Sequence, residues 1–531
     1  MQAVGLPLKV VFRFNDLFIL LLAVVCAVAV SLFLYRSATG RAIRACAQNA
    51  ELAQMKGVNL DGAIQRAFAF GGALAGAAAF AFALYYTRPF GNHGAQSGLL
   101  AFTAAILGGI GNPTGALLSS LILGVCAALS DYFLAAQWTP VLMQVLLIGL
   151  LVLRPTGIIG DPQTEEAASK TERDALTTRA SGSHSRRGRW LLWAVAAVAL
   201  IFPVLDLMFN LRSQVLLTGI GIFILLALGL NILLGFAGVL DLGFAVSYGL
   251  GGYTAAMLTN RWSPLGASLP QPLEFAVVLL VSALCGGIFG LLKGRLTLRL
   301  RSDYLAVVTL ALGLLARQII VNLGDVTGGV GGIAALPPPY VLAQPLTHPT
   351  LQYYLIFGAV ILAAWASHRL IDSHLGRAWL AGSQDELAAA SCGVDVAGNK
   401  AVAFGVSSAL AALAGALYAS VFSYVAPDMV AFHVSSLILA MVIFGGAGSA
   451  AGAIVGALLI AGYDRMIIPR LGALLALIPL GNINLGYAPD VRGASYFNFG
   501  LALYLTVLLR ARRSGETSAR QTVDVEGAEK S

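Results

Sequence analysis

The chain has 531 residues, of which 58% are hydrophobic and 11% are charged, whereas about a quarter of the residues in a soluble domain are charged. This composition excludes an ordinary soluble globular protein. The formal net charge of +8 comes from basic residues in short segments between long apolar runs, which is the positive-inside pattern of a protein embedded in membrane lipid and predicts no nucleic-acid partner.

The first part of the chain, residues 1–160, is predicted to form one unit of membrane-spanning helices. Its first apolar run, at 17–35, is free of charge and matches the ~20 residues that a helix needs to cross a bilayer. The charge-free region 97–130 is too long for one helix, so we expect two crossings that meet near Asn112. The remaining spans of this unit are expected at 67–87 and 138–153.

A polar segment at 161–189 separates this unit from a longer one. It mixes both charges and has almost no large apolar side chains, which predicts a flexible linker, and its six Lys and Arg residues place it in the cytoplasm. The second unit is predicted over 190–510 and is followed by a disordered cytoplasmic tail at 511–531. Its spans are expected at 190–209, 214–235, 238–260, 273–292, 303–322, 351–370, 401–425, 432–447, 450–468 and 495–510.

Polar residues of the second unit divide into loop and membrane positions. Lys293 and Arg295 follow an apolar run and are expected in a cytoplasmic loop. Asn231, Asp241 and Arg317 lie in or beside apolar runs, and polar groups inside a membrane are functional candidates. Arg317 lies near the outer end of its run, so its side chain can instead reach the membrane interface.

An internal repeat relates residues 40–75 to residues 376–411, because at a fixed offset of 336 the two stretches share 14 of 36 positions. Each copy contains a polar segment between apolar runs, and its alternation of Ala with polar residues is compatible with a helix. The glycine that follows, Gly57 or Gly393, can end this helix in a left-handed turn. The repeat predicts two equivalent cytoplasmic surfaces; the alternative is a pair of ordinary solvated loops.

A second repeat, at an offset of 337, relates the glycine-rich segments 108–116 and 445–453. Because both polar segments fall on the same side of the membrane, the two units form a parallel repeat with a pseudo-twofold axis along the membrane normal. The glycine-rich segments either line a pathway with unwound backbone or pack helices closely, and the sequence leaves both open. The pathway candidates are Gly109, Gly111, Asn112, Asn231, Gly446 and Gly448.

Sequence signatures of catalysis and cofactor binding are absent from the chain. It contains no Gly-x-x-x-x-Gly-Lys-Ser/Thr phosphate loop, no His-Glu-x-x-His and no Cys-x-x-Cys. The five cysteines show no paired spacing, which favours small core residues over a disulfide or metal framework. We therefore predict that this chain is not an enzyme and holds no metal or cofactor of its own.

Several stretches resemble the permease subunits of branched-chain amino-acid ABC importers. Ala-Phe-Thr-Ala-Ala-Ile-Leu-Gly-Gly-Ile-Gly at 101–111 and Leu-Arg-Pro-Thr-Gly-Ile-Ile-Gly at 153–160 are similar to the C-terminal part of the H-type subunit. Residues 190–510 are similar to a nearly complete M-type subunit, through the stretches 229–238, 248–255 and 303–311 and the Thr327-Gly328-Gly329 loop. The whole chain resembles a fusion of the two subunits, an all-α polytopic membrane protein.

The resemblance implies two permease units side by side in a bacterial inner membrane. Two separate ATPase subunits would lie beneath them and bind the ATP, and a periplasmic solute-binding protein would lie above. The substrate would be a branched-chain or other hydrophobic amino acid, with urea and short amides as the alternative. The residues that would contact the ATPases are Gln48, Asn49, Glu51, Ala53 and Gly57, together with Gln384, Asp385, Glu386, Ala389 and Gly393.

Two departures from the family pattern affect this interpretation. The first unit lacks the N-terminal helices of an H-type subunit, including the counterpart of 229–255, so either its start is truncated or misassigned or another chain supplies them; otherwise the pathway is incomplete. Leu314 stands where the family often has an acidic residue, so Arg317 is expected to lack a partner. A non-transporting remnant is one alternative, and an ion-coupled secondary transporter is another, although the spans hold very few acidic residues.

Overall fold

The computed structural model describes residues 14–86, 93–109, 111–153, 202–203, 206, 213–259, 271–297, 302–341, 344–468 and 470. The chain divides into two compact units, Met1–Ala175 and Leu176–Ser531, and each is described here by itself. In the described residues, nine helices are long and apolar enough to cross a membrane. The expected class, an all-α polytopic membrane protein, is confirmed.

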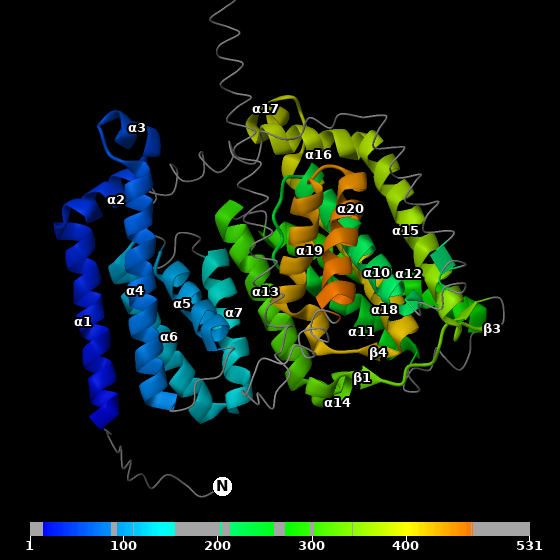
Figure 1. Ribbon diagram of the computed structural model, residues 1–531, viewed down its shortest axis with the longest axis horizontal. Helices are drawn as coiled ribbons and strands as arrows, with labels where there is room; N and C mark the ends of the chain where they lie inside the picture. Colours follow the sequence, from blue (N-terminus) through cyan, green and yellow to red (C-terminus); the bar gives the residue numbers. More distant parts are fainter. Residues whose placement is uncertain are drawn as a thin grey trace, which may run out of the picture. The chain divides into compact units, whose positions relative to one another are not determined.

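The first unit is built from helices that follow the predicted apolar runs (Figure 1). The region 97–130 is split into two helices on either side of Asn112, as expected. The fourth helix begins at Leu60, earlier than the predicted 67, because Asn59 accepts a hydrogen bond from the backbone N–H of Gly62 and so caps the helix. The elements are α1 (Phe14–Arg36), α2 (Ala38–Gln48), α3 (Ala50–Met55), α4 (Leu60–Tyr86), α5 (His93–Gly108), α6 (Pro113–Phe133), η1 (Ala136–Trp138) and α7 (Thr139–Leu153).

The second unit has more helices and a few two-residue strands. Its helices are α10 (Gln214–Asn231), η2 (Ile232–Phe236), α11 (Ala245–Thr259), α12 (Gln271–Thr297), α13 (Ser302–Asn322), α14 (Gly324–Thr327), η3 (Gly329–Gly331), α15 (Pro349–Asp372), α16 (His374–Gln384), α17 (Glu386–Ser391), α18 (Val396–Phe422), η4 (Pro427–Val430), α19 (Phe432–Gly445), α20 (Ala450–Gly462) and η5 (Tyr463–Ile467). The strands are β1 (Ile333–Ala334), β2 (Tyr340–Val341), β3 (Gln344–Pro345) and β4 (Tyr424–Val425).

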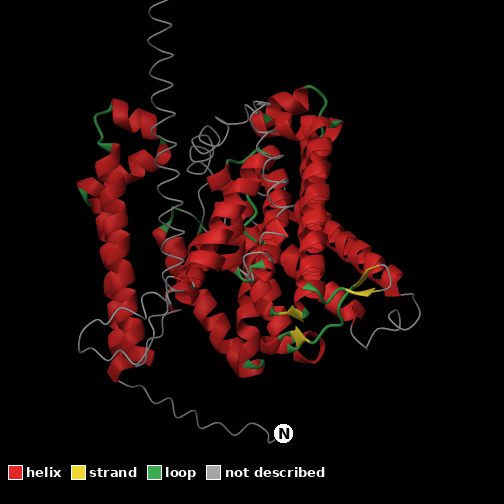
Figure 2. Cartoon of the chain, turned by 45° about the vertical axis from the view of Figure 1, so that its right-hand side comes forward, coloured by secondary structure: helices red, strands yellow, loops and turns green. Residues whose placement is uncertain are grey.

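The strands form two antiparallel pairs, β1 with β4 and β2 with β3. They lie at the end of the second unit opposite to α16 and α17 (Figure 2). We call these two ends the strand end and the short-helix end. The stretch between the expected spans 303–322 and 351–370 therefore contains ordered structure, because β1 pairs with a strand that follows α18 about ninety residues later.

One predicted span of the second unit is wrong. The run 238–260 was expected to form a single helix, but residues 237–244 are not helical and α11 begins only at Ala245. The other spans expected between 214 and 468 are present, with ends shifted by a few residues. The spans expected at 190–209 and 495–510, the linker 161–189 and the tail 511–531 lie outside the described residues, so they stay predictions.

The core of the second unit lies around α10, α11 and α18. Helix α10 is apolar on all sides and buried along nearly its whole length, as a helix inside a bundle should be. Glycines allow the backbones to approach closely, because a Cβ at Gly251 or Gly415 would overlap a carbonyl oxygen of the facing helix. This is the small-residue packing that membrane helices use in place of a hydrophobic driving force.

Candidate functional site

Each polar segment of the repeat folds into two short helices that meet at a capped break. The pairs are α2–α3 in the first unit and α16–α17 in the second. At the break, Asn49 accepts a hydrogen bond from the backbone N–H of Leu52 (2.9 Å), and Asp385 accepts one from Leu387 (2.8 Å). Asn and Asp are among the best residues for this capping role, so the sequence sets both the position and the direction of the second helix.

Both pairs end in the same left-handed turn. Gly57 has φ +82° and Gly393 has φ +83°, as the sequence predicted. The backbone N–H of the residue after each glycine donates to the carbonyl of Ala53 (3.0 Å) or Ala389 (3.1 Å), which completes a Schellman motif. Ala53 and Ala389 are also the buried members of their short helices. The ten sequence-predicted contact residues are therefore not equivalent, because these two alanines face inward.

The outward face of the pairs carries large apolar side chains that the sequence analysis missed. Met55 is 85% exposed, Leu387 is 79% exposed, and Leu52 is also exposed. Gln48, Asn49, Gln384, Asp385 and Glu386 are exposed around them. Exposed apolar residues rimmed by polar ones are typical of a protein contact surface. The signal in the sequence was the three-residue spacing of Leu52 and Met55, which puts both on one helix face.

Each pair is attached to the preceding long helix by the same contact. The guanidinium of Arg41 donates to the carbonyl of Arg36 (3.2 Å), and that of Arg377 donates to the carbonyl of Asp372 (2.9 Å). Both arginines thus satisfy a carbonyl at a helix C-terminus, which favours positive charge. The short helices are therefore attached to the C-terminal ends of the long ones.

The second pair is anchored more firmly than the first. Trp379 of α16 is buried and donates from Nε1 to the carbonyl of Asn399 (2.7 Å). The ammonium of Lys400 pairs with Glu386 (2.6 Å), which ties α17 to α18. The positions aligned with Glu386 and Lys400 in the first unit hold Ala50 and Ile64, so they cannot form this ion pair.

The glycine-rich segments combine a turn with a close helix crossing. Gly109, Gly111, Gly446 and Gly448 all have φ near +90° to +100°, a conformation that L side chains rarely adopt. The neighbouring glycines at 108, 115, 445 and 452 are at the crossings of α5 with α6 and of α19 with α20, where a Cβ would overlap facing backbone. Close packing therefore accounts for part of each glycine pattern, and a pathway role for the turn residues stays a prediction.

Two of the pathway candidates contact each other. The backbone N–H of Gly448 donates to Asn231 Oδ1 (2.9 Å), so the end of α10 holds the turn between α19 and α20. Directly after Asn231, the helix widens into the π-helix η2, a feature that often marks functional sites. In the first unit, Asn112 instead caps its own helix, accepting from the backbone N–H groups of Thr114 (3.1 Å) and Gly115 (3.2 Å).

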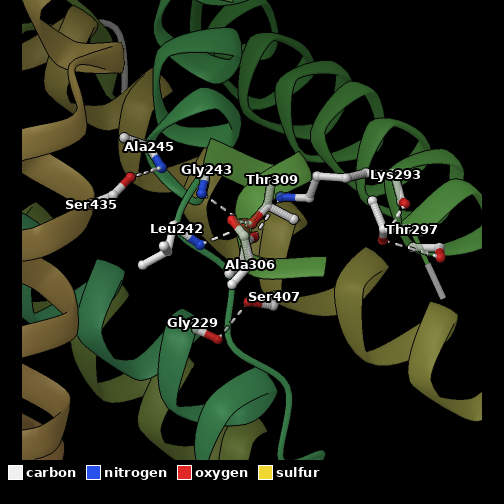
Figure 3. A network of polar contacts seen from close by, with 12 residues as sticks. Gly229, Leu242, Gly243, Ala245, Lys293, Thr297, Ala306, Thr309, Ser407 and Ser435 are labelled. Atoms are coloured by element: carbon white, nitrogen blue, oxygen red, sulfur yellow. Dashed lines mark hydrogen bonds and ion pairs between the residues drawn. The ribbon is translucent and has the colours of Figure 1, made fainter. Parts of the chain in front are cut away.

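The non-helical segment 237–244 contains a buried ion pair. Asp241 Oδ2 lies 2.5 Å from Lys293 Nζ, and both side chains are at most 1% exposed. Lys293 was expected in a loop, but α12 continues through it to Thr297, so that expectation was wrong. In Figure 3 the Lys293 side chain extends from its helix toward Thr309 and the segment that carries Leu242 and Gly243. A buried charge needs a partner, and Asp241 in an apolar run was the signal that one exists.

Arg317 also has an acidic partner, contrary to the expectation. Its Nη2 lies 3.1 Å from Asp428 Oδ1. Asp428 belongs to η4, which follows α18, so the partner comes from 111 residues further along the chain rather than from the same helix. Sequence spacing within one span could not have found it.

Comparison with known proteins finds a matching family and several relatives. The family model described as "Branched-chain amino acid transport system / permease component" matches residues 5–153 and 214–490. The high-affinity branched-chain amino acid transport system permease protein LivM of Salmonella typhimurium is 33% identical over 292 residues, which cover 51% of this chain and 66% of LivM.

Two further relatives match shorter stretches. The high-affinity branched-chain amino acid transport system permease protein LivH of Salmonella typhimurium is 41% identical over 138 residues, which cover 26% of this chain and 45% of LivH. BraD of Pseudomonas aeruginosa is 38% identical over 157 residues, covering 30% of this chain and 51% of BraD. The chain thus spans at most 66% of the length of these relatives. No solved structure matches the chain.

Proposed function

The chain belongs to the family of branched-chain amino acid transport system permease components, and from this premise we propose that it is the membrane permease of an ATP-driven importer. One of its units acts as an H-type part and the other as an M-type part. The imported substrate is an amino acid with a branched or other hydrophobic side chain. ATP binds to separate ATPase subunits, and this chain is not an enzyme.

The observation that carries this proposal is the duplicated pair of short helices. Two surfaces of the same construction, each with a capped break, a left-handed glycine end and exposed apolar side chains, suit a partner that is itself present in two copies. Two ATPase subunits meet this requirement. We therefore assign the exposed face of α2–α3 and of α16–α17 to ATPase docking.

This assignment sets the orientation of the protein in the bacterial inner membrane. The short-helix end faces the cytoplasm, together with the linker 161–189 and the tail 511–531. The strand end faces the periplasm, where a solute-binding protein delivers the substrate. The basic residues in the linker and around the first pair support this orientation through the positive-inside rule.

In the mechanism that we propose, movement of the ATPases is passed to the long helices through their short-helix pairs. When the two ATPase subunits close on ATP and reopen after hydrolysis, they shift both docking surfaces. Arg41 and Arg377 hold each pair to the helix before it, so the long helices shift too. The permease then alternates between two access states, as a two-state element biased by a ligand does.

We also propose that helices equivalent to α11 and α12 cover α4 in the assembled permease. In the second unit, α11 and α12 approach α18 so closely at Ala412 that a Cβ on Gly251 or Gly286 would overlap it. Gly76 is aligned with Ala412, and among the described residues nothing lies within 4 Å of a Cβ built there. These helices would come either from a segment before Met1 or from a further chain.

The test of this function is transport in proteoliposomes that contain the full chain, its ATPase subunits and its solute-binding protein. ATP-dependent uptake of labelled leucine, unaffected by excess urea, is the expected result. Competition by urea would instead assign the permease to urea or short amides. Uptake that persists without the ATPase, driven by an ion gradient, would show a secondary transporter and refute the proposal.

A further inference from the structure

Residues 237–244 form a largely buried segment between the helices, and part of its backbone is satisfied by side chains. The backbone N–H of Leu242 donates to Thr309 Oγ1 (3.1 Å) and that of Ala245, which follows the segment, donates to Ser435 Oγ (3.0 Å). Asp241 Oδ1 accepts from the N–H of Gly243 (3.0 Å). Non-helical backbone at membrane depth is tolerated only where protein satisfies it in this way.

The first residues of the segment 237–244 pack against α16, the first helix of the second short-helix pair. Gly238 has φ +66°, and a Cβ built on it would lie 3.0 Å from Ser383 Cβ in α16. Ala237 and Val239 pack in one apolar cluster with Trp379, the buried tryptophan of the same helix. A displacement of α16 therefore meets this segment directly.

The segment and its flanking residues hold α19 at both of its ends. Ala245 contacts Ser435, which is in the first turn of α19, and Asn231 contacts Gly448 in the turn that follows it. Helix α19 thus lies between two anchors that belong to the connection from α10 to α11. Any shift of this connection acts on α19 and on the glycine-rich turn together.

The ion pair fixes the middle of the segment. Asp241 uses one oxygen for the backbone of Gly243 and the other for Lys293. The Lys293 ammonium also lies over the rings of Phe289 (5.8 Å) and Phe404 (5.4 Å), so it is held by α12 and by α18. The carboxylate is therefore bound on both oxygens, which fixes Asp241 to its own backbone turn and to α12.

We propose that Asp241 and Lys293 are positioning residues that couple the ATPase docking surface to the pathway. They make the segment 237–244 stiff enough to pass the movement of α16 to α19 and to the turn at 446–448. The inference rests on the proposed transport function, and neither residue contacts the substrate. The first unit contributes no such segment among its described residues, so the proposed coupling segment belongs to the second unit.

The decisive variant removes both charges at once, as Asp241→Asn with Lys293→Met. Single neutralisation leaves a buried unpaired charge and can prevent folding, whereas replacing both members of a buried pair is often neutral for stability. A pair that serves stability alone would therefore tolerate the double change. The control is His368→Gln, which removes an exposed pair on α15.

The measurement is the amount of leucine taken up per ATP hydrolysed in the proteoliposomes described above. We expect the double variant to insert and to hydrolyse ATP normally, with this ratio lowered by about tenfold. The control should match the unmodified chain. As a second readout, the five native cysteines are replaced by Ser and a cysteine is placed at Ala447. In this background, ATP should change the maleimide labelling of position 447 when Asp241 and Lys293 are present but not in the double variant.

Each outcome distinguishes the proposed coupling role of Asp241 and Lys293, which we call the relay, from the transport function. A double variant with a normal uptake ratio and ATP-responsive labelling would overturn the relay and leave the importer intact. An equal loss in the control would assign the effect to charge removal in general and also overturn the relay. Absence of ATP-driven uptake in the unmodified chain would refute the importer and the relay together.

Discussion

The left-handed glycine at the end of each short-helix pair gives the sharpest test of the docking surface. Gly393 has φ +83°, and a Cβ built on it meets no atom within 4 Å. A substitution there is therefore opposed by backbone conformation and not by a clash. For an L residue this conformation costs about 1–2 kcal/mol. Since 1.4 kcal/mol corresponds to about a factor of ten, Gly393→Val should lower the equilibrium constant for forming the correct turn by about 5–30-fold.

If ATPase docking needs this turn, the apparent affinity of the ATPase for the permease falls by up to the same factor. The assay is ATPase binding to the purified permease, followed by the leucine taken up per ATP hydrolysed. Gly57→Val should behave in the same way, because φ there is +82°. Gly393→Asn should retain most of the affinity, since Asn tolerates this conformation. Gly358→Ala, in open space on α15, is the matched control.

Two results would refute this reasoning. Normal docking and uptake by both valine variants would show that the turn is not part of the contact. An equal loss in Gly393→Asn and Gly393→Val would show that the effect comes from side-chain size and not from φ.

Three further predictions concern the second unit. Asn231→Ala leaves the N–H of Gly448 without its acceptor, so thermal unfolding in detergent should show a loss of about 1–3 kcal/mol, and an unchanged midpoint would contradict the contact. Gly445→Ala places a Cβ against the backbone of α20, so size-exclusion chromatography should show little monodisperse protein, unlike Gly358→Ala. Arg317→Gln removes a partly exposed ion pair, so stability should change by less than about 1 kcal/mol, and a larger loss would mean that the pair has a structural role.

The sequence predicted those features that depend on local pattern. Apolar runs located most of the spans, since a helix in a membrane satisfies its own backbone and needs only length and composition. The glycine ends at Gly57 and Gly393 were predicted for the same reason, because a left-handed turn is a local preference. The offsets of 336 and 337 predicted two units of related construction.

Features that depend on distant partners could not be predicted. The break at 237–244 is satisfied by Thr309 and Ser435, which are 67 and 190 residues away from the atoms that they bind. Lys293 follows an apolar run and has basic neighbours, so counting charges placed it in a loop, although its partner Asp241 holds it in the protein. Composition measures polarity along the chain and carries no information about which polar groups meet.

The exposed side chains of Leu52, Met55 and Leu387 have a consequence for how the protein must be made. In the proposed assembly, they are covered only once the ATPases have bound. Until then, each chain exposes these apolar side chains to the cytoplasm, where they favour aggregation and recognition by proteases. Expression of the permease alone should therefore yield less intact protein than co-expression with its ATPases, so subunit supply would control permease abundance.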